Sequence, residues 1–234
     1  MDHDQMTLWL SVDPMADKYP SISPYAYCAW DPVKLVDPDG RDIWLVNKNK
    51  ERYKYFVGMS SDGYDTYISE TIKALNKLYK TKTIGSQIFQ IASTDLISIE
   101  INESEETVLE LQLNINSASN DISNKQIVLF NPFLGIQEIE TNKILSPAAG
   151  LGHEIGHIIN YYSNPEEYNS RKSKKRNDGW TDDEEKYNIE TWENMIASEW
   201  GELSRAGHSL VDPDGNIKFR IVNTTESTET TIKE

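Results

Sequence analysis

Apolar and polar residues alternate through much of the stretch from 43 to 145, which is the period-two pattern of β-strands. Several of these runs are bounded by turn-forming residues, and the last of them ends at an Asn-Pro pair. The pattern predicts strands at 42–46, 52–58, 96–102, 107–115 and 125–132.

Two segments change to helical spacing. Residues 65–80 carry apolar side chains three or four positions apart, with Asp65 in place as an N-cap. A second helix is expected from Ser146, because serine caps a first turn and the proline that follows it fits the first helical position. Gly152 and Gly156 weaken this second helix, so we expect them to give close clearance to a strand or a substrate backbone.

The region after the second helix is polar and then helical again. Residues 164–180 are expected to form a long polar connection. Thr181 and Glu184 then have the spacing of a capping box, which opens a helix that runs to about Arg205.

The two ends of the chain carry turn-forming and polar residues instead of periodic patterns. Residues 1–42 hold Asp-Pro, Pro and Gly between short apolar runs, which indicates tight turns that join short strands. The hexapeptide LVDPDG occurs at 35–40 and again at 210–215, and we interpret both copies as turns. The tail at 223–234 is polar, and we expect it to be disordered.

Composition and charge limit the class of protein. The 234 residues can hold one large or two small domains with an ordinary apolar core. A formal net charge of -15 argues against a nucleic-acid partner, because phosphate binding needs basic surface. The basic run at 170–178 is interpreted as a solvated loop, with substrate recruitment as the alternative. Cys28 is the single cysteine, so a buried thiol is expected and not a disulfide framework.

The sequence contains neither a membrane span nor a secretory signal that we can recognise. No apolar run approaches the roughly 18 residues that a membrane span needs. The N-terminus is acidic and lacks a basic region followed by an apolar stretch. The chain is therefore expected to be cytosolic or to be exported by a route that this sequence does not encode.

The segment SPAAGLGHEIGHIINYY at 146–162 contains the motif H-E-x-x-H, formed by His153, Glu154 and His157. Positions i and i+4 of a helix share one face, so the two imidazoles point at one spot. Glu154 projects about 100° away, which suits a base that acts on water better than a ligand. The chain has four histidines, so a chance motif is of order 1 in 100. The pattern predicts a zinc (Zn2+) site, with two solvent-facing histidines as the alternative.

A catalytic zinc takes three protein ligands and leaves one position for water, so a third ligand must come from elsewhere. The helix expected after 181 offers six glutamates. Glu185 falls at the centre of its apolar stripe, Glu199 lies within the stripe, and Glu193 lies at the margin, about 80° from Glu185. The outward-pointing ones are Glu184, Glu190 and Glu202. A buried carboxylate is costly unless it is paired or bound to a cation, so Glu185 is the first choice, with a first-turn acid as the alternative.

His208 and Arg205 follow this helix and are candidate catalytic residues. Either side chain could stabilise the oxyanion of amide hydrolysis, or could simply be a cation favoured at a helix C-terminus. The predicted reaction is zinc-assisted amide hydrolysis. The metal activates a water and polarises the scissile carbonyl, while Glu154 takes a proton from that water and passes it to the leaving amine. The strand at 125–132 is interpreted as an edge strand on which an extended peptide pairs.

The segment LWLSVDPMADKYPSISPYAYCAWDPVKLVDPDGRDIW at 8–44 resembles the end of the Rhs repeat-associated core of polymorphic bacterial toxins. The likeness includes the Asp-Pro pairs at Asp13 and Asp37 and the terminal DPDG. It implies that a toxin domain follows directly and that many such proteins cleave themselves after the second DPxG. Arg41 stands where a leucine is usual, next to the cleavage position after Gly40.

Residues 125–208, roughly a third of the chain, resemble zincin-type toxin or effector metallopeptidases. The matching features are FNP before the helix, HEIGH, EEKYNIETWEN and GELSRAGH. In that group an acidic pair and a later Glu-Asn follow the H-E-x-x-H helix, and here they correspond to Glu184 with Glu185 and to Glu193 with Asn194. The resemblance implies Glu193 as the alternative third ligand. It also implies delivery into a target cell, cleavage of a protein there, and a neutralising immunity protein.

Together the residues and the resemblances predict an α+β fold. A zincin-like domain at 43–222 is expected to pack its active-site helix on a small mixed sheet, after a short all-β Rhs-core tail at 1–42. The expected function is a zinc-dependent endopeptidase toxin, cytoplasmic before export and then secreted or delivered by a dedicated secretion system, with the Rhs core of its parent protein as a partner. Two alternatives stay open: a non-enzymatic Rhs remnant with a degenerate metal site, and a zinc amidase.

Overall fold

The structure is a computed structural model that describes residues 43–87, 98–104, 111–112, 125–212 and 214–224. The chain divides into two compact units, Met1–Gly40 and Arg41–Glu234, and every described residue belongs to the second. The expected Rhs-core tail, Cys28 and the first copy of LVDPDG therefore lie outside the described residues.

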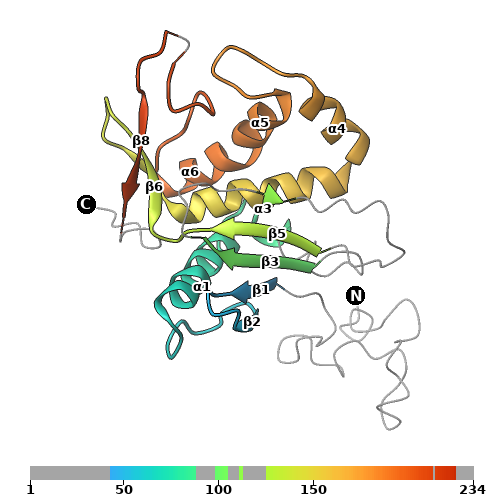
Figure 1. Cartoon of the computed structure of the whole chain (residues 1–234), viewed down its shortest axis with the longest axis vertical. Coiled ribbons are helices and arrows are strands. Elements are labelled where there is room, and N and C mark those ends of the chain that lie inside the picture. Colours follow the sequence, from blue (N-terminus) through green and yellow to red (C-terminus); the bar gives the residue numbers. More distant parts are fainter. Residues whose placement is uncertain (1–42, 88–97, 105–110, 113–124, 213, 225–234) are drawn as a thin grey trace, which may run out of the picture. The chain divides into compact units, whose positions relative to one another are not determined.

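A mixed sheet of five strands, in the order β2-β1-β3-β5-β4, forms one layer of the second unit (Figure 1). The central strands β1, β3 and β5 run parallel, and β2 and β4 run antiparallel to their neighbours. The strands are β1 (Ile43–Val46), β2 (Arg52–Tyr55), β3 (Ser98–Glu103), β4 (Leu111–Gln112) and β5 (Lys125–Phe130). Each predicted strand is present at least in part, but the one predicted at 52–58 ends at Tyr55, because the chain turns at 56–58 and Gly58 takes a φ of 75°. The sheet is mixed as expected.

Strand β5 lies inside this sheet and not at its edge. One side of β5 pairs with β3 along its whole length, from Lys125 to Phe130. The other side pairs with β4 at Ile127 and Val128. The prediction that 125–132 is an edge strand is therefore wrong. Alternation along one strand reports its two faces, but it carries no information about the strands on either side.

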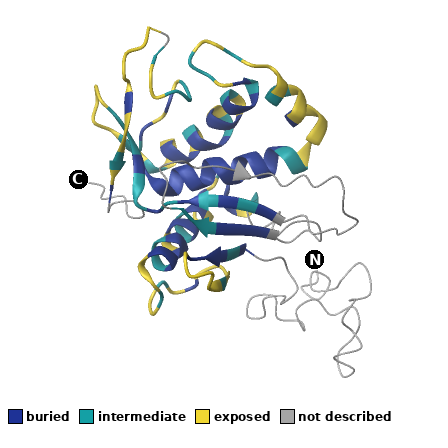
Figure 2. Cartoon of the chain, viewed as in Figure 1, coloured by how far each residue is buried: buried dark blue, intermediate teal, exposed yellow. Residues whose placement is uncertain are grey.

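Helices α1 (Thr66–Tyr79) and α3 (Pro147–Ser163) pack against one face of this sheet (Figure 1). Both begin as predicted: Asp65 accepts a hydrogen bond from Ile68 N at 3.0 Å, and Ser146 accepts one from Ala149 N at 3.3 Å. Figure 2 shows that α3 is buried along most of its length. The core between helices and sheet includes Ile68, Ile72, Leu75, Leu151, Ile155, Ile158, Ile99, Ile101 and Val128.

Four helical segments beyond α3 contact it from the side away from the sheet (Figure 1). Helix α4 (Pro165–Ser173) occupies the first half of the segment at 164–180, so the prediction of a long polar connection is wrong for that half. Asn164 caps this helix, because its side chain accepts a hydrogen bond from Glu167 N. Its outer surface is exposed (Figure 2). The other segments are α5 (Asp183–Asn188), the π-helix η4 (Ile189–Glu193) and α6 (Asn194–Trp200).

The helix predicted from the capping box differs from the structure at both ends. The N-cap of α5 is Asp182 and not Thr181, and its carboxylate accepts from Glu185 N at 3.0 Å. The helical run ends at Trp200 and not near Arg205, because Gly201 takes a left-handed φ of 68°. A shift of one residue at the cap is the ordinary uncertainty of two adjacent capping side chains.

The π-helix η4 changes the direction in which later side chains point. Its hydrogen bonds span five residues, so each residue advances by less than the roughly 100° of an α-helix. Over 189–193 this difference accumulates and turns Glu193 towards the face of Glu185, from which an ideal α-helix would separate it by about 80°. Both carboxylates are consequently buried on the side that faces α3.

A second sheet of three antiparallel strands, in the order β7-β6-β8, lies beside the N-terminal end of α3 (Figure 1). Its strands are β6 (Leu134–Glu138), β7 (Ile144–Leu145) and β8 (Phe219–Asn223). Sequence patterning did not reveal this sheet, because its strands are short and β8 joins from the other end of the domain.

The C-terminal region confirms one expectation and corrects another. The turn predicted at 210–215 is present, since Gly215 N donates to Asp212 O at 2.9 Å with a φ of 86°. The tail was expected to be disordered from 223, which is wrong for its first two residues. Asn223 ends β8, and Thr224 is buried. The rest of that tail lies outside the described residues.

Gly152 and Gly156 of the H-E-x-x-H helix give clearance to neighbouring helices, and not to a strand or substrate as expected. A Cβ atom at Gly156 would lie 2.6 Å from Asn188 Oδ1 and 2.7 Å from Trp192 Cδ1. A Cβ atom at Gly152 would lie 2.7 Å from Ile196 Cδ1, which is the flexible end of an aliphatic side chain. The two positions therefore differ in how easily the neighbour can move.

Gly156→Ala is expected to destabilise the fold by about 1–3 kcal/mol, which outweighs a gain of about 1 kcal/mol in helix propensity. The neighbouring Asn188 amide is fixed because it donates to His153 O at 2.9 Å. Gly152→Ala is the matched control and should stay within about 1 kcal/mol of the wild type, since a methyl group can rotate away. Denaturant unfolding measures both variants, and equal losses would contradict this account.

Candidate metal centre

Three side chains predicted as metal ligands converge where α3 faces α5. The Nε2 atoms of His153 and His157 lie 3.2 Å apart. Oε2 of Glu185 lies 3.2 Å from His157 Nε2 and 3.4 Å from His153 Nε2. A tetrahedral zinc with bonds of about 2.1 Å separates its ligand atoms by roughly 3.4 Å. The three atoms are therefore already spaced like the corners of one face of a zinc tetrahedron.

His208 approaches the same cluster from the loop after α6. Its Nε2 lies 3.6 Å from Glu185 Oε2, and its Nδ1 lies 3.2 Å from the hydroxyl of Thr181. The ligand atoms of His153, Glu185 and His208 all lie within 4.8 Å of one another, which makes this triad a possible metal site by itself. We include His157 in the centre because its Nε2 is closer to Glu185 than that of His208 is. His208 is 40% exposed and stands at the open side of the cluster.

The donor set fits a divalent metal of the zinc type. Two imidazoles and one carboxylate, all buried, are a common set for such ions. Burial alone would lower the pKa of His153, but Glu185 and Glu193 raise it to about 10. Burial alone would raise the pKa of Glu185, but His153 and His157 hold it far below its usual range. Both shifts indicate that the site stabilises positive charge on its histidines. A bound metal ion would supply this positive charge in place of the protons.

Each histidine of α3 has a second carboxylate behind its ring. Nδ1 of His153 lies 3.0 Å from Glu193 Oε2, and Nδ1 of His157 lies 3.4 Å from Glu184 Oε1. These are ion-pair distances, although neither contact is aligned as a hydrogen bond. Carboxylates in this position fix the ring orientation and raise its basicity as a ligand. Glu193 thus lies on the opposite side of the His153 ring from the cluster, which favours Glu185 as the third ligand.

Three of the buried carboxylates around the centre each have a dedicated cation. Buried charges are tolerated when they are paired in this way. The basic run at 170–178 was expected to be a solvated loop, but its beginning belongs to α4 and supplies two of these cations. The pairs are Arg171 with Glu184 (2.6 Å), Lys172 with Glu185 (3.0 Å) and Arg205 with Glu193 (2.7 Å).

Glu154 is the exception among the buried carboxylates of the centre. It is 5% exposed, and among the described residues no group donates a hydrogen bond or an ion pair to its carboxylate. Burial raises its pKa against the opposing effect of His153 and His157. A carboxylate with a raised pKa beside a metal site is suited to accept and return a proton.

An open cleft of about 260 Å³ leads to the cluster. His153, Glu154 and His208 line one side of it. The remaining lining is largely apolar and comes from the second sheet and the loops beside it, at Leu134, Ile136, Leu145, Leu210 and Ile221. Glu154 thus lines an open cleft beside the candidate ligands.

Arg205 lines part of this cleft, but its guanidinium is committed to Glu193. Nε donates to Glu193 Oε1 at 2.7 Å, and a second guanidinium nitrogen donates to the other oxygen. Asn194 holds the Arg205 backbone on both sides, accepting from its N at 2.7 Å and donating to its O at 2.8 Å. This geometry favours a positioning role for Arg205 over the predicted oxyanion donor, and leaves His208 as the candidate donor.

Sequence reasoning missed several residues that support the centre. Glu184 was expected to point outward, but it is fully buried and accepts from Asn160 Nδ2 at 2.8 Å. Trp192 Nε1 donates to Asn160 Oδ1 at 2.8 Å, and Asn188 Nδ2 donates to His153 O at 2.9 Å. One signal was available: Asn160 follows the motif histidine by three residues, and Asn188 follows Glu184 by four, which is helical spacing.

Comparison with known proteins adds no relative. No family model matches the chain, and neither a curated protein nor a solved structure does. Within the described ranges, the helices are too short or too polar to cross a membrane.

Proposed function

We propose that the described domain is a zincin-like, zinc-dependent endopeptidase. His153, His157 and Glu185 are the proposed metal ligands, and Glu154 is the proposed general base. The observation that carries this proposal is a triangle of ligand atoms with sides of 3.2 to 3.4 Å, next to a buried carboxylate that has no cation of its own among the described residues.

The residues of the chain have distinct tasks in this reaction. When bound, the metal supplies Lewis-acid chemistry, because it lowers the pKa of a water and polarises a carbonyl oxygen. Glu154 accepts a proton from the attacking water and passes it to the leaving amine, and its raised pKa suits both steps. His208 donates to the oxyanion that develops on the scissile carbonyl, with Thr181 orienting its ring. Arg205 acts through Glu193, which holds the His153 ring.

The charge balance of the centre supports the same reaction. With neutral histidines, the four buried glutamates exceed their three paired cations by one negative charge. A divalent cation would reverse the sign of this excess. A site with one net positive charge complements the negative charge that develops as an amide is attacked.

The segment at 8–44 extends the proposal to a biological role. We propose a toxin domain that follows an Rhs core, acts on a protein inside a target cell, and is neutralised by an immunity protein in the producing cell. The support for this role is the resemblance of that segment, together with the residues that follow the H-E-x-x-H helix.

One observation favours a second function. His208 Nε2 lies 3.6 Å from Glu185 Oε2, which is close enough for His208 to become a fourth protein ligand. Four protein ligands characterise a structural zinc site, in which no position remains for water. The chain would then be a non-enzymatic remnant whose metal stabilises the fold.

The first test is the metal content of the purified full-length chain, measured by elemental analysis. We expect one zinc per chain in the wild type, and affinity weakened by more than about 100-fold in His157→Ala. Phe56→Ala is the control and should keep its zinc, because the Phe56 ring is exposed and contributes no ligand atom to the cluster. Absence of zinc from the wild type after zinc is supplied would overturn the proposed centre.

A further inference from the structure

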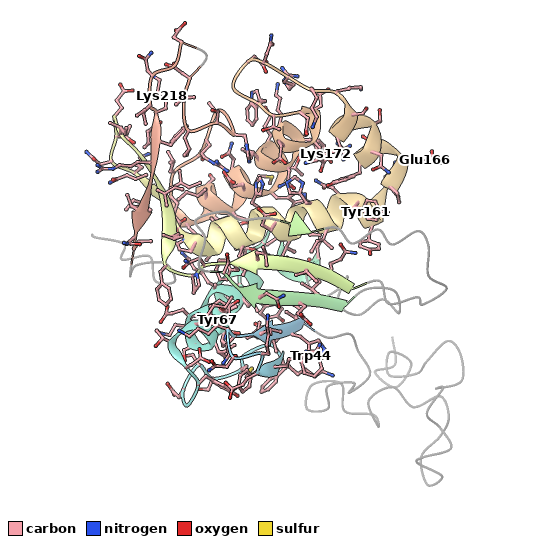
Figure 3. The ribbon with its side chains drawn as sticks, viewed as in Figure 1. Trp44, Tyr67, Tyr161, Glu166, Lys172 and Lys218 are labelled. Carbon is pink, nitrogen blue, oxygen red and sulfur yellow. The ribbon has the colours of Figure 1, made fainter. Side chains whose placement is uncertain are left out.

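Lys172 joins the basic run to the metal centre. It lies near the C-terminal end of α4, and Figure 3 places it in the region between α4 and α5. Its Nζ atom lies 3.0 Å from Glu185 Oε1 and 3.7 Å from Asp182 Oδ2. The side chain is 43% exposed, yet its ammonium group contacts two buried carboxylates.

The two oxygens of Glu185 consequently have different partners. Oε2 faces the three histidine Nε2 atoms at 3.2, 3.4 and 3.6 Å. Oε1 accepts a hydrogen bond from Lys172. Of the two oxygens, Oε2 therefore faces the metal site, while the hydrogen bond from Lys172 takes one of the two lone pairs of Oε1 and leaves that oxygen the weaker ligand.

The fold fixes Lys172 in this place. An exposed lysine held by one ion pair would contribute little, because the flexible side chain loses entropy when it is ordered. Here Arg171, its neighbour, donates to Glu184 at 2.6 Å. Beyond the helix, Asp183 N donates to Lys174 O at 3.1 Å, and Lys175 Nζ lies 3.1 Å from Asp182. The end of α4 is thus tied to the start of α5 on both sides of Lys172.

We propose that Lys172 is a positioning residue that holds Glu185 as a one-oxygen metal ligand. The proposal rests on the metal centre proposed above. Carboxylates can bind cations through one oxygen or through both, and a second oxygen would occupy the position that a catalytic zinc leaves open. The charge of Lys172 also offsets part of the charge of Glu185, so the metal is held less tightly and remains more electrophilic.

Cobalt(II) substitution tests the proposal, because its visible absorption weakens as the coordination number rises from four to five. Lys172→Met removes the charge and keeps the length of the side chain. We expect a weaker cobalt band and metal binding that is tighter by about tenfold, since a cation a few ångströms from the metal is lost and solvent screens part of its effect. Lys172→Arg keeps the charge and should keep the band and affinity of the wild type.

Lys174→Met is the matched control, since Lys174 belongs to the same basic run and its side chain is exposed. A Lys172→Met protein with the spectrum and affinity of this control would overturn the role of Lys172 and leave the metal centre standing. Weaker metal binding in Lys172→Met would also overturn it, because it would show mere support of the local fold. A wild-type chain that takes up no cobalt would overturn the centre and this role together.

Discussion

Glu154→Gln is expected to retain zinc and lose proteolytic activity by a factor of about 10²–10⁴. The substitution removes the base and leaves the ligand atoms of His153, His157 and Glu185 in place. It also removes a charge that has no cation partner among the described residues, so the fold should not suffer. The measurement is the number of new N-termini that the purified chain produces in a denatured bacterial lysate, with zinc content determined on the same samples.

Glu190→Gln is the matched control for this experiment, because the same chemical change falls on an exposed glutamate of η4. The control should retain both zinc and activity. Loss of zinc from Glu154→Gln would contradict the role of Glu154 as a base. If the wild type binds zinc but produces no new N-termini, and Glu154→Gln changes neither result, a structural zinc site with His208 as the fourth ligand would be favoured.

Glu185→Ala is expected to lose mainly zinc affinity, whereas Glu193→Ala is expected to lose mainly stability of the fold. Glu185→Ala should weaken zinc binding by well over 100-fold, because it removes a ligand atom, whereas removing a carboxylate behind a ligating histidine costs about 10–100-fold. Glu193→Ala should instead destabilise the fold by about 3–5 kcal/mol, since it leaves the buried Arg205 without its partner. Lys172, the partner of Glu185, is half exposed and can turn to water.

Competition with a chromophoric chelator measures the zinc affinity of both variants. Denaturant unfolding in the presence of excess chelator measures stability without the contribution of the metal. Glu166→Ala provides the baseline, because Glu166 points away from the domain on the exposed side of α4 (Figure 3). Equal losses of affinity, or a larger loss in Glu193→Ala, would mean that Glu193 and not Glu185 binds the metal.

Local signals predicted much of the centre. The caps at Asp65 and Ser146 and the motif at His153 to His157 depend on contacts within four residues, and the structure has them as expected. Glu185 was also placed on the correct face, because it precedes the π-helix and the α-helical phase still holds there.

Features that depend on irregular or distant geometry could not be predicted. Glu184 was wrongly turned outward, because the apolar stripe of its own helix carries no sign of the polar partners that bury it, which are Asn160 of α3 and Arg171 of α4. Helix α4 is polar on almost all of its surface, so it has no apolar stripe that would reveal it in the sequence. Its ion pairs with α5, such as Arg171 with Glu184, follow no periodic pattern either. The partners of β5 and β6 are set by strand pairing between distant segments, which a single strand does not encode.

The π-helix makes the centre sensitive to chain length as well as to residue type. An in-frame loss of one codon between Ile189 and Glu193 would allow a regular α-helix, a more favourable backbone by itself. The same deletion would leave the Glu193 carboxylate and the Asn194 amide near their present directions, because seven regular steps of about 100° from Glu185 end within about 20° of it. A regular α-helix of unchanged length would instead turn Glu193 by about 80°, away from His153. Among descendants of this chain, the present length with the π-helix and a length one residue shorter with a regular α-helix would both keep the metal centre, whereas one added residue would not.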